Sequence, residues 1–204
     1  MSLAGKHILI GISGGIAAYK IPELIRSLVK EGAEVRVTTT RHALEFVTEL
    51  TLQTVSGNRV YSDVFAAINE HSTEHISLPD WCDAMLVAPT TANVLGKMAA
   101  GIADDALTTT ICSCVARKPV IVAPAMNDKM WENPATRHAV ETIRGWQNIR
   151  VIEPAEGPLA VRYQRQRKNA GTGSTAGSLG ICPHASDFGG SEDPDYSRRH
   201  AGED

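Results

Sequence analysis

Pro119-Val120-Ile121-Val122-Ala123-Pro124-Ala125-Met126-Asn127-Asp128-Lys129-Met130-Trp131 is the stretch that decides the fold. Its first part, residues 119–123, is short, apolar and rich in β-branched side chains, which is typical of a buried parallel strand. Behind it, residues 133–146 begin with Asn-Pro and place apolar side chains at helical spacing, which predicts a helix. The stretch therefore connects the carboxyl end of a strand to a helix, and ligands bind at that edge in open α/β sheets.

The octet Pro124–Trp131 has two interpretations. It is either the start of a helix, with Asn127 as a common type of N-cap and Met126, Met130 and Trp131 in the core, or a binding segment. In the second case the apolar side chains surround one neutral amide, which both donates and accepts hydrogen bonds. Composition by itself favours the helix cap.

A second strand–turn–helix unit begins the chain. The strand pattern at 7–12 is interrupted by Ser13-Gly14-Gly15, and residues 16–32 then form a helical pattern that ends near a glycine. Such a turn suits a phosphate, because unpaired N–H groups and the positive end of the helix dipole converge there. A tight turn that packs helix against strand explains the glycines equally well. The spacing is not GxGxxG, so a dinucleotide is not indicated.

The rest of the ordered pattern alternates strands with helices. A strand at 34–40 ends in hydroxyls, and Thr39 or Thr40 either binds phosphate or caps the helix that begins at Arg41. This alternation predicts a parallel sheet with both faces covered. Further elements are a short strand at 59–63, a strand at 84–88, a helix from about 94 to Gly101, and a helix from Asp104-Asp105 to about Val115.

Composition excludes several classes of protein. A formal net charge of -3 and 43% hydrophobic residues describe an ordinary soluble chain, with no basic surface for nucleic acid. The four cysteines have neither paired CxxC spacing nor the density of a disulfide framework. No apolar run has the length of a membrane span or of a signal core. We therefore expect no nucleic-acid or membrane partner, and a cytoplasmic location.

His71-Ser72-Thr73-Glu74-His75 matches the zinc-peptidase pattern H-x-x-E-H. That chemistry requires a helix, which places both imidazoles on one face. The following Ile76-Ser77-Leu78 alternates as an extended segment does, and Pro79 ends any helix soon after. We therefore expect no zinc. His75 instead points into a cleft as an acid, base or donor, or is an ordinary surface or core histidine.

In their order along residues 3 to about 160, these motifs resemble those of the flavin-dependent cysteine decarboxylases. The resemblance is greatest to the decarboxylase half of bacterial phosphopantothenoylcysteine decarboxylase/synthetase. Each motif alone is weak, but the ordered set is specific. The matching segments are Gly11–Lys20, His75, Pro89–Asn93, Gly101–Asp104, Pro124–Asn127 and Met130-Trp131.

The resemblance implies a three-layer, Rossmann-like α/β fold with a central parallel sheet in residues 1–160, which binds FMN. It also implies homo-oligomers with a trimer as the building unit, often dodecamers, and a site shared between subunits. The implied phosphate-binding residues are Ser13, Gly14, Ile16, Ala17 and Thr39. The implied flavin-lining residues are Pro89, Thr90, Thr91, Ala92 and Asn93. His75 and Asn127 correspond to the catalytic pair, and Asn127 and Met130 to substrate contacts.

The implied reaction converts 4'-phospho-N-pantothenoyl-L-cysteine to 4'-phosphopantetheine in coenzyme A biosynthesis. Direct loss of CO₂ would leave an unstabilised carbanion, whereas oxidation of the neighbouring CH₂–SH to a thioaldehyde supplies an electron sink. Asn127 holds the carboxylate through neutral hydrogen bonds, and His75 assists thiol deprotonation or hydride removal. Alternatives are a peptidyl-cysteine decarboxylase, a flavin prenyltransferase, and a non-catalytic flavin-binding regulatory subunit.

Residues 161–204 depart from the family pattern. The family has a glycine-rich, cysteine-containing flap there, whereas this segment is poor in apolar residues and has the composition of a disordered segment. Codons for residues 161–173, read one nucleotide later, permit a flap of the type Ser-Gly…Gly-Asn-Gly-Arg-Met. We therefore expect an irregular, frameshifted tail that also replaces a synthetase domain, and the activity of a chain without the flap is an open question.

Overall fold

The computed structural model describes residues 3–63 and 74–152, except for the side chains of residues 74–77. A six-stranded, fully parallel sheet in the order β3-β2-β1-β4-β5-β6 forms its centre. The strands are β1 (His7–Ile12), β2 (Glu34–Thr39), β3 (Val60–Tyr61), β4 (Ala84–Thr90), β5 (Val120–Pro124) and β6 (Ile149–Val151). The predicted α/β class with a central parallel sheet is confirmed.

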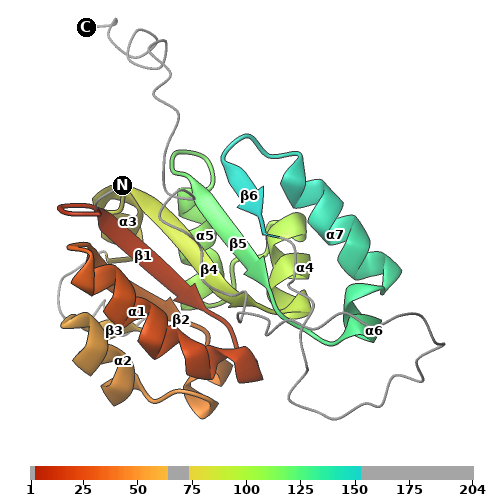
Figure 1. Ribbon diagram of the computed structural model, residues 1–204. Helices are drawn as coiled ribbons and strands as arrows, with labels where there is room; N and C mark the ends of the chain where they lie inside the picture. Colours follow the sequence, from red (N-terminus) through yellow and green to blue (C-terminus); the bar gives the residue numbers. More distant parts are fainter. Residues whose placement is uncertain (1–2, 64–73, 153–204) are drawn as a thin grey trace, which may run out of the picture.

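Helices lie on both faces of this sheet (Figure 1). The α-helices are α1 (Ile21–Lys30), α2 (Glu49–Ser56), α3 (Glu74–Trp81), α4 (Ala92–Ala100), α5 (Ala106–Cys114), α6 (Asp128–Trp131) and α7 (Pro134–Arg144). Two 3₁₀-helices, η1 (Ile16–Lys20) and η2 (Arg41–Glu45), follow β1 and β2. Together the sheet and its two helical coverings make the expected three layers.

The buried side chains form two clusters, one on each face of the sheet. Ile8, Ile10 and Ile12 of β1 pack with α1 and α2, whereas Leu9, between them, packs with the helices of the opposite face. That opposite cluster contains buried residues of α3, α4, α5 and α7. Successive side chains of a strand point to opposite faces, which produces the two clusters.

The strand order places a switch point between β1 and β4. The chain proceeds from β1 to β2 on one side, and from β4 to β5 on the other. The connections diverge there, so a crevice is expected at the carboxyl ends of these strands. The segments after β1, β2, β4 and β5 all reach this edge, and they contain most of the predicted binding residues.

Two boundaries differ from the sequence-based expectations. Residues 76–78, expected to be extended, lie within α3, which has Pro79 inside the helix. Leu78 and Cys82 are buried in the core, where α3 packs against α5. The segment 89–93, expected to be a loop, divides between the end of β4 and the start of α4. Within the described ranges, every helix is too short or too polar to cross a membrane.

Candidate functional site

Ser13 joins the segment after β1 to the segment after β4. Its backbone N–H and its hydroxyl both donate to the Pro89 carbonyl oxygen, at 3.2 and 2.7 Å. The hydroxyl oxygen in turn accepts from the Thr91 N–H at 3.0 Å, and Ser13 is completely buried. The only hydroxyl proton of Ser13 is therefore engaged within the protein. Its phosphate-binding role stays a prediction, while its effect on the position of both segments is direct.

Gly14 occupies a position where a side chain does not fit. A Cβ atom added there would lie 2.6 Å from the His42 Cβ, in η2, and 3.0 Å from the His42 carbonyl carbon. The glycine therefore lets η2 approach the turn that precedes η1. Gly15, the residue before η1, provides no side-chain cap, and Ile16 is exposed while Ala17 is half-buried. The backbone of this turn is thus left accessible between two short helices.

At the carboxyl end of β2, the fold gives different roles to Thr39 and Thr40, which the sequence could not distinguish. Thr40 is the cap of η2, since its hydroxyl oxygen accepts from the Ala43 N–H at 3.3 Å. Thr39 is completely buried, and its hydroxyl has no hydrogen-bond partner within residues 3–63 and 74–152; the same holds for Thr38 on the opposite face. An unpartnered buried hydroxyl is costly. Of Thr39 and Thr40, Thr39 is therefore the one whose hydroxyl is not used by the fold.

The end of β4 is also largely satisfied by the fold. The Thr90 hydroxyl donates to the Val87 carbonyl at 2.7 Å, and Thr91 caps α4 by accepting from the Val94 N–H at 3.5 Å. Ala92 is half-buried and Asn93 is exposed on the first turn of α4. The predicted flavin-lining residues thus lie together where β4 ends and α4 begins, but only some of their side chains are free to contact a ligand.

Asn127 is the N-cap of α6. Its Oδ1 accepts from the Met130 N–H at 2.9 Å, and its side chain is exposed. The cap interpretation is therefore confirmed, but it does not exclude binding. Since the cap uses only Oδ1, the Nδ2 group keeps two hydrogens that can be donated to a carboxylate.

The apolar residues around Asn127 are only partly in the core. Met126 and Trp131 are half-buried against the opposite-face cluster, whereas Met130 is 44% exposed. The expectation that all three belong to the core is thus wrong for Met130, and this exposure suits its predicted role as a substrate contact. The Arg137 guanidinium of α7 lies 5.2 Å from the centre of the Trp131 ring, a contact that the sequence did not indicate.

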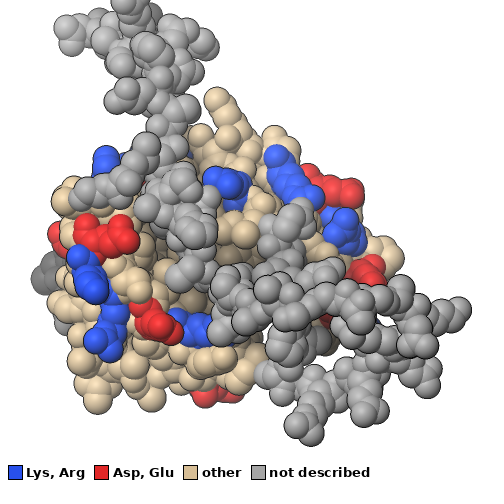
Figure 2. All heavy atoms as spheres, viewed as in Figure 1, with Lys and Arg blue, Asp and Glu red and all other residues tan. Residues whose placement is uncertain are grey.

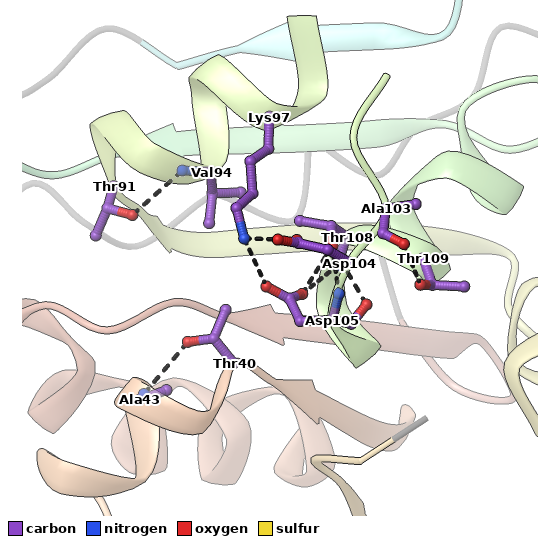
Figure 3. A network of polar contacts seen from close by, with 10 residues as sticks. All are labelled: Thr40, Ala43, Thr91, Val94, Lys97, Ala103, Asp104, Asp105, Thr108 and Thr109. Atoms are coloured by element: carbon purple, nitrogen blue, oxygen red, sulfur yellow. Dashed lines mark hydrogen bonds and ion pairs between the residues drawn. The ribbon is translucent and has the colours of Figure 1, made fainter. Parts of the chain in front are cut away.

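Lys97 links α4 to the segment before α5 (Figure 3). Its Nζ lies 2.6 Å from Asp104 Oδ1 and 3.3 Å from Asp105 Oδ2. The hydrogen bond with Asp104 raises the pKa of Lys97 and lowers that of Asp104. Asp105 also caps α5 through a reciprocal capping box with Thr108. This network had no predicted role, and it fixes the position at which α5 begins.

The start of α5 matters because it supports the end of β1. A Cβ at Gly11 would lie 2.5 Å from Leu107 Cδ1, so the second residue of α5 packs directly against the strand. Ser13 and Gly14 follow this contact along the chain. The ion pairs of Lys97 thus lie at the start of the helix whose second residue packs against β1.

His75 lies at the second residue of α3, but its side chain is outside the described residues, as is the whole of His71. The predicted pairing of His75 with Asn127 thus stays a prediction. Among the side chains that the structure describes, no three His, Cys, Asp or Glu residues are placed to hold a metal ion.

Comparison with known proteins identifies relatives of this chain. The model of the Flavoprotein family matches residues 1–178. The coenzyme A biosynthesis bifunctional protein CoaBC of Vibrio cholerae is 51% identical over 142 residues, which is 70% of this chain and 35% of that protein. The CoaBC protein of Bacillus subtilis is 45% identical over 161 residues, or 79% of this chain and 39% of that protein. The chain thus spans 35 and 39% of the length of these two curated relatives.

Solved structures give the same picture. A cysteine-to-serine mutant of PPC decarboxylase complexed with pantothenoylaminoethenethiol has a TM-score of 0.69 and 34% identity, with 76% of this chain and 85% of that chain covered. The FMN-dependent cysteine decarboxylase SpaF has a TM-score of 0.67 and 32% identity, with 76 and 87% covered. The FMN-binding protein AtHal3 has a TM-score of 0.68 and 34% identity, with 78 and 86% covered.

Proposed function

The chain belongs to the flavoprotein family, and on that premise we propose that it binds FMN and decarboxylates 4'-phospho-N-pantothenoyl-L-cysteine in coenzyme A biosynthesis. The observation that carries the proposal is the likeness to PPC decarboxylase over 85% of that chain. The proposal concerns the decarboxylation only, since this chain spans about two fifths or less of the bifunctional relatives.

The residues at the crevice fit a flavin mononucleotide. In the described part of the chain, the buried Thr39 hydroxyl has a proton without an acceptor, and a phosphate oxygen supplies that acceptor. Gly14 leaves the backbone of the turn free of side chains next to η2. The chemistry that FMN supplies when bound is a two-electron oxidation of the substrate's CH₂–SH carbon and its later reversal.

The side chains of the chain itself then hold the substrate. Asn127 Nδ2 donates to the carboxylate that is lost, while Oδ1 stays bound to the cap of α6. Because this amide is neutral, it orients the carboxylate without the ionic pairing that would stabilise the ground state. Met130 forms an apolar wall beside it. His75 assists removal of the thiol proton, as an imidazole can near neutral pH.

The test is to mix the purified chain with FMN and the phosphorylated substrate, then follow flavin absorbance and product mass. Bleaching of the flavin together with loss of CO₂ from the substrate is the expected result. His75→Asn should keep FMN but lose substrate-dependent bleaching. A chain that cannot be loaded with FMN, or that loads and leaves the substrate unchanged, contradicts the proposal.

The same assay distinguishes the main alternatives. The similarity to SpaF, an FMN-dependent cysteine decarboxylase with 32% identity, favours a test with a second cysteine compound. A peptide that ends in cysteine serves for this purpose. Faster turnover of that peptide than of the phosphorylated substrate would indicate a peptidyl-cysteine decarboxylase. FMN binding with turnover of neither compound would indicate a non-catalytic flavin-binding subunit.

We also propose that the chain acts as a cytoplasmic homo-oligomer built from trimers. Large apolar side chains are exposed near the crevice, on η1 and around the start of α2, and such exposure is typical of an interface. They are Ile16 (57% exposed), Tyr19 (59%), Phe46 (43%) and Leu50 (72%). On the face shown in Figure 2, acidic and basic side chains are interspersed, which gives no support to a nucleic-acid partner. Light scattering after size exclusion tests the trimer.

A further inference from the structure

Trp81, the last residue of α3, is held by side chains at the start of β1 and β2. The centre of its ring lies 4.8 Å from that of the His7 ring, with the two planes inclined by 31°, and 4.2 Å from the Arg36 guanidinium carbon. Glu34 joins these two neighbours, because its carboxylate lies 3.6 Å from His7 Nε2 and 3.6 Å from the Arg36 guanidinium. These four residues form what we call the Trp81 clamp.

The clamp follows from the register of the two strands. His7 pairs with Glu34 across the strands, and Arg36 is two residues further along β2, so all three side chains point to the face that α3 covers. The backbone adds to this attachment: the His7 N–H donates to Asp83 Oδ2, and the Asp83 N–H donates to the His7 carbonyl oxygen, each at 2.8 Å. The end of α3 is therefore fixed to β1 by side-chain and backbone contacts.

The first turn of α3 depends on how the other end of this helix is held. Pro79 lies inside the helix and has no N–H, so the carbonyl of residue 75 cannot accept the usual helical hydrogen bond from residue 79. His75 is the second residue of α3, about 9 Å along the helix axis from Trp81. A shift or tilt of the helix at Trp81 therefore also moves the backbone of His75.

We propose that Trp81 is a positioning residue for the decarboxylation: the Trp81 clamp sets the place of α3 on the sheet, and with it the backbone position of His75. The inference rests on the proposed function, which gives His75 its role. Trp81 acts through the helix, because its partners lie at the start of β1 and β2, at the opposite edge of the sheet from the expected crevice.

Trp81→Leu tests the proposal, since it removes the aromatic ring but keeps an apolar side chain in the core. Loss of the two ring contacts should speed hydrogen exchange of the α3 amides roughly tenfold. In the flavin-bleaching assay, kcat should fall roughly ten- to a hundredfold. KM and FMN affinity should change little, because the predicted binding residues are untouched.

Two further variants separate the ring contacts from general packing. Trp81→Phe keeps an aromatic face for His7 and Arg36, and should recover most of the exchange protection and most of kcat. Arg36→Met removes only the cation over the ring, and should show the same two effects at a smaller size. Arg36→Met also keeps the test valid should Trp81→Leu fail to fold.

Trp146→Leu is the matched control. Trp146 is also half-buried against the opposite-face cluster, but it follows α7 and lines a cavity with residues of α4 and α5. Its loss should lower Tm without changing exchange in α3 or kcat. Unchanged α3 exchange or unchanged kcat in Trp81→Leu, or the same losses in Trp146→Leu, overturns the proposal. Hydrogen exchange needs neither FMN nor substrate, so a parent chain without turnover would refute the proposed function while exchange still decides whether the clamp fixes α3.

Discussion

Asn127→Asp separates the two roles of this side chain, because only one of them is changed. Asp is as good an N-cap as Asn, and one carboxylate oxygen can accept from the Met130 N–H, which now lies 2.9 Å from Asn127 Oδ1. The other carboxylate oxygen replaces the Nδ2 donor with a negative acceptor. The fold should therefore be retained while binding of a carboxylate is opposed.

The expected size of the effect follows from the charge. Two like charges about 4 Å apart repel by roughly 4 kcal/mol at an effective dielectric constant near 20. Since each 1.36 kcal/mol is a factor of ten, this corresponds to roughly a thousandfold loss of kcat/KM. Loss of the donor without a new charge is milder, at about 1.5–3 kcal/mol for a hydrogen bond to a charged group. Asn127→Ser, which keeps a capping oxygen, should therefore lose roughly ten- to a hundredfold.

The assay is stopped-flow flavin absorbance with the phosphorylated cysteine substrate, together with product mass and thermal melting of each variant. Asn133→Asp is the matched control, because Asn133 caps the next helix by accepting from the Ala135 N–H at 2.9 Å. The same substitution there should leave both melting and turnover nearly unchanged. Equal turnover of Asn127→Asp and the parent chain would reduce Asn127 to a helix cap, and an equal loss in Asn133→Asp would show a general charge effect.

Three further predictions concern Gly14, Thr39 and Lys97. Gly14→Ala introduces a Cβ only 2.6 Å from the His42 Cβ, so it should cost about 1–3 kcal/mol of stability and weaken FMN binding. Gly96→Ala is the control: it has open space around it and should stabilise α4 by up to about 1 kcal/mol in thermal melts. Thr39→Val should stabilise the FMN-free chain by about 1 kcal/mol and should weaken FMN affinity roughly tenfold in an FMN titration. Thr38→Val should stabilise the FMN-free chain in the same way but leave FMN affinity unchanged. Lys97→Met should lower Tm most between about pH 4 and 10. The pKa of Lys97 is raised, so its ion pair stabilises the fold until the pH rises through that pKa; the pKa of Asp104 is lowered, so the stabilisation lasts until the pH falls through that pKa. Lys97→Arg should restore the parent Tm, and a pH-independent loss of Tm would contradict the ion-pair explanation.

The main elements of the fold were predictable because their signals are local. Residues 7–12 form β1 as predicted, since an uninterrupted apolar run suits a strand buried on both faces. The helix behind Asn133-Pro134 forms as α7 for the same reason of local pattern. The misses are α2, which buries only Leu52 and Ser56, and β6, which has three residues and lies at the sheet edge. Neither has enough periodicity to be detected.

The candidate site was predictable in its location but less so in its hydrogen bonds. The carboxyl edge of the sheet follows from the strand–turn–helix pattern. The bond from Ser13 to Pro89 joins residues 76 positions apart, so no local pattern contains it. Likewise, adjacent hydroxyls at the end of β2 have the same chemistry in sequence, and only the backbone direction assigns the cap of η2 to Thr40.

The polar groups at the crevice differ in whether the fold already satisfies them. The Ser13 and Thr90 hydroxyl protons are engaged with backbone carbonyls, and such bonds position the segments whatever ligand is present. The Thr39 hydroxyl and the Asn127 Nδ2 group have no such partner among the described residues. A buried hydroxyl without a partner destabilises the free protein; at Thr39, the last residue of β2, a bond to the proposed phosphate would offset that cost. We therefore place the functional weight on Thr39 and Asn127, and expect substitutions of Ser13 to act through the arrangement of β1 and β4.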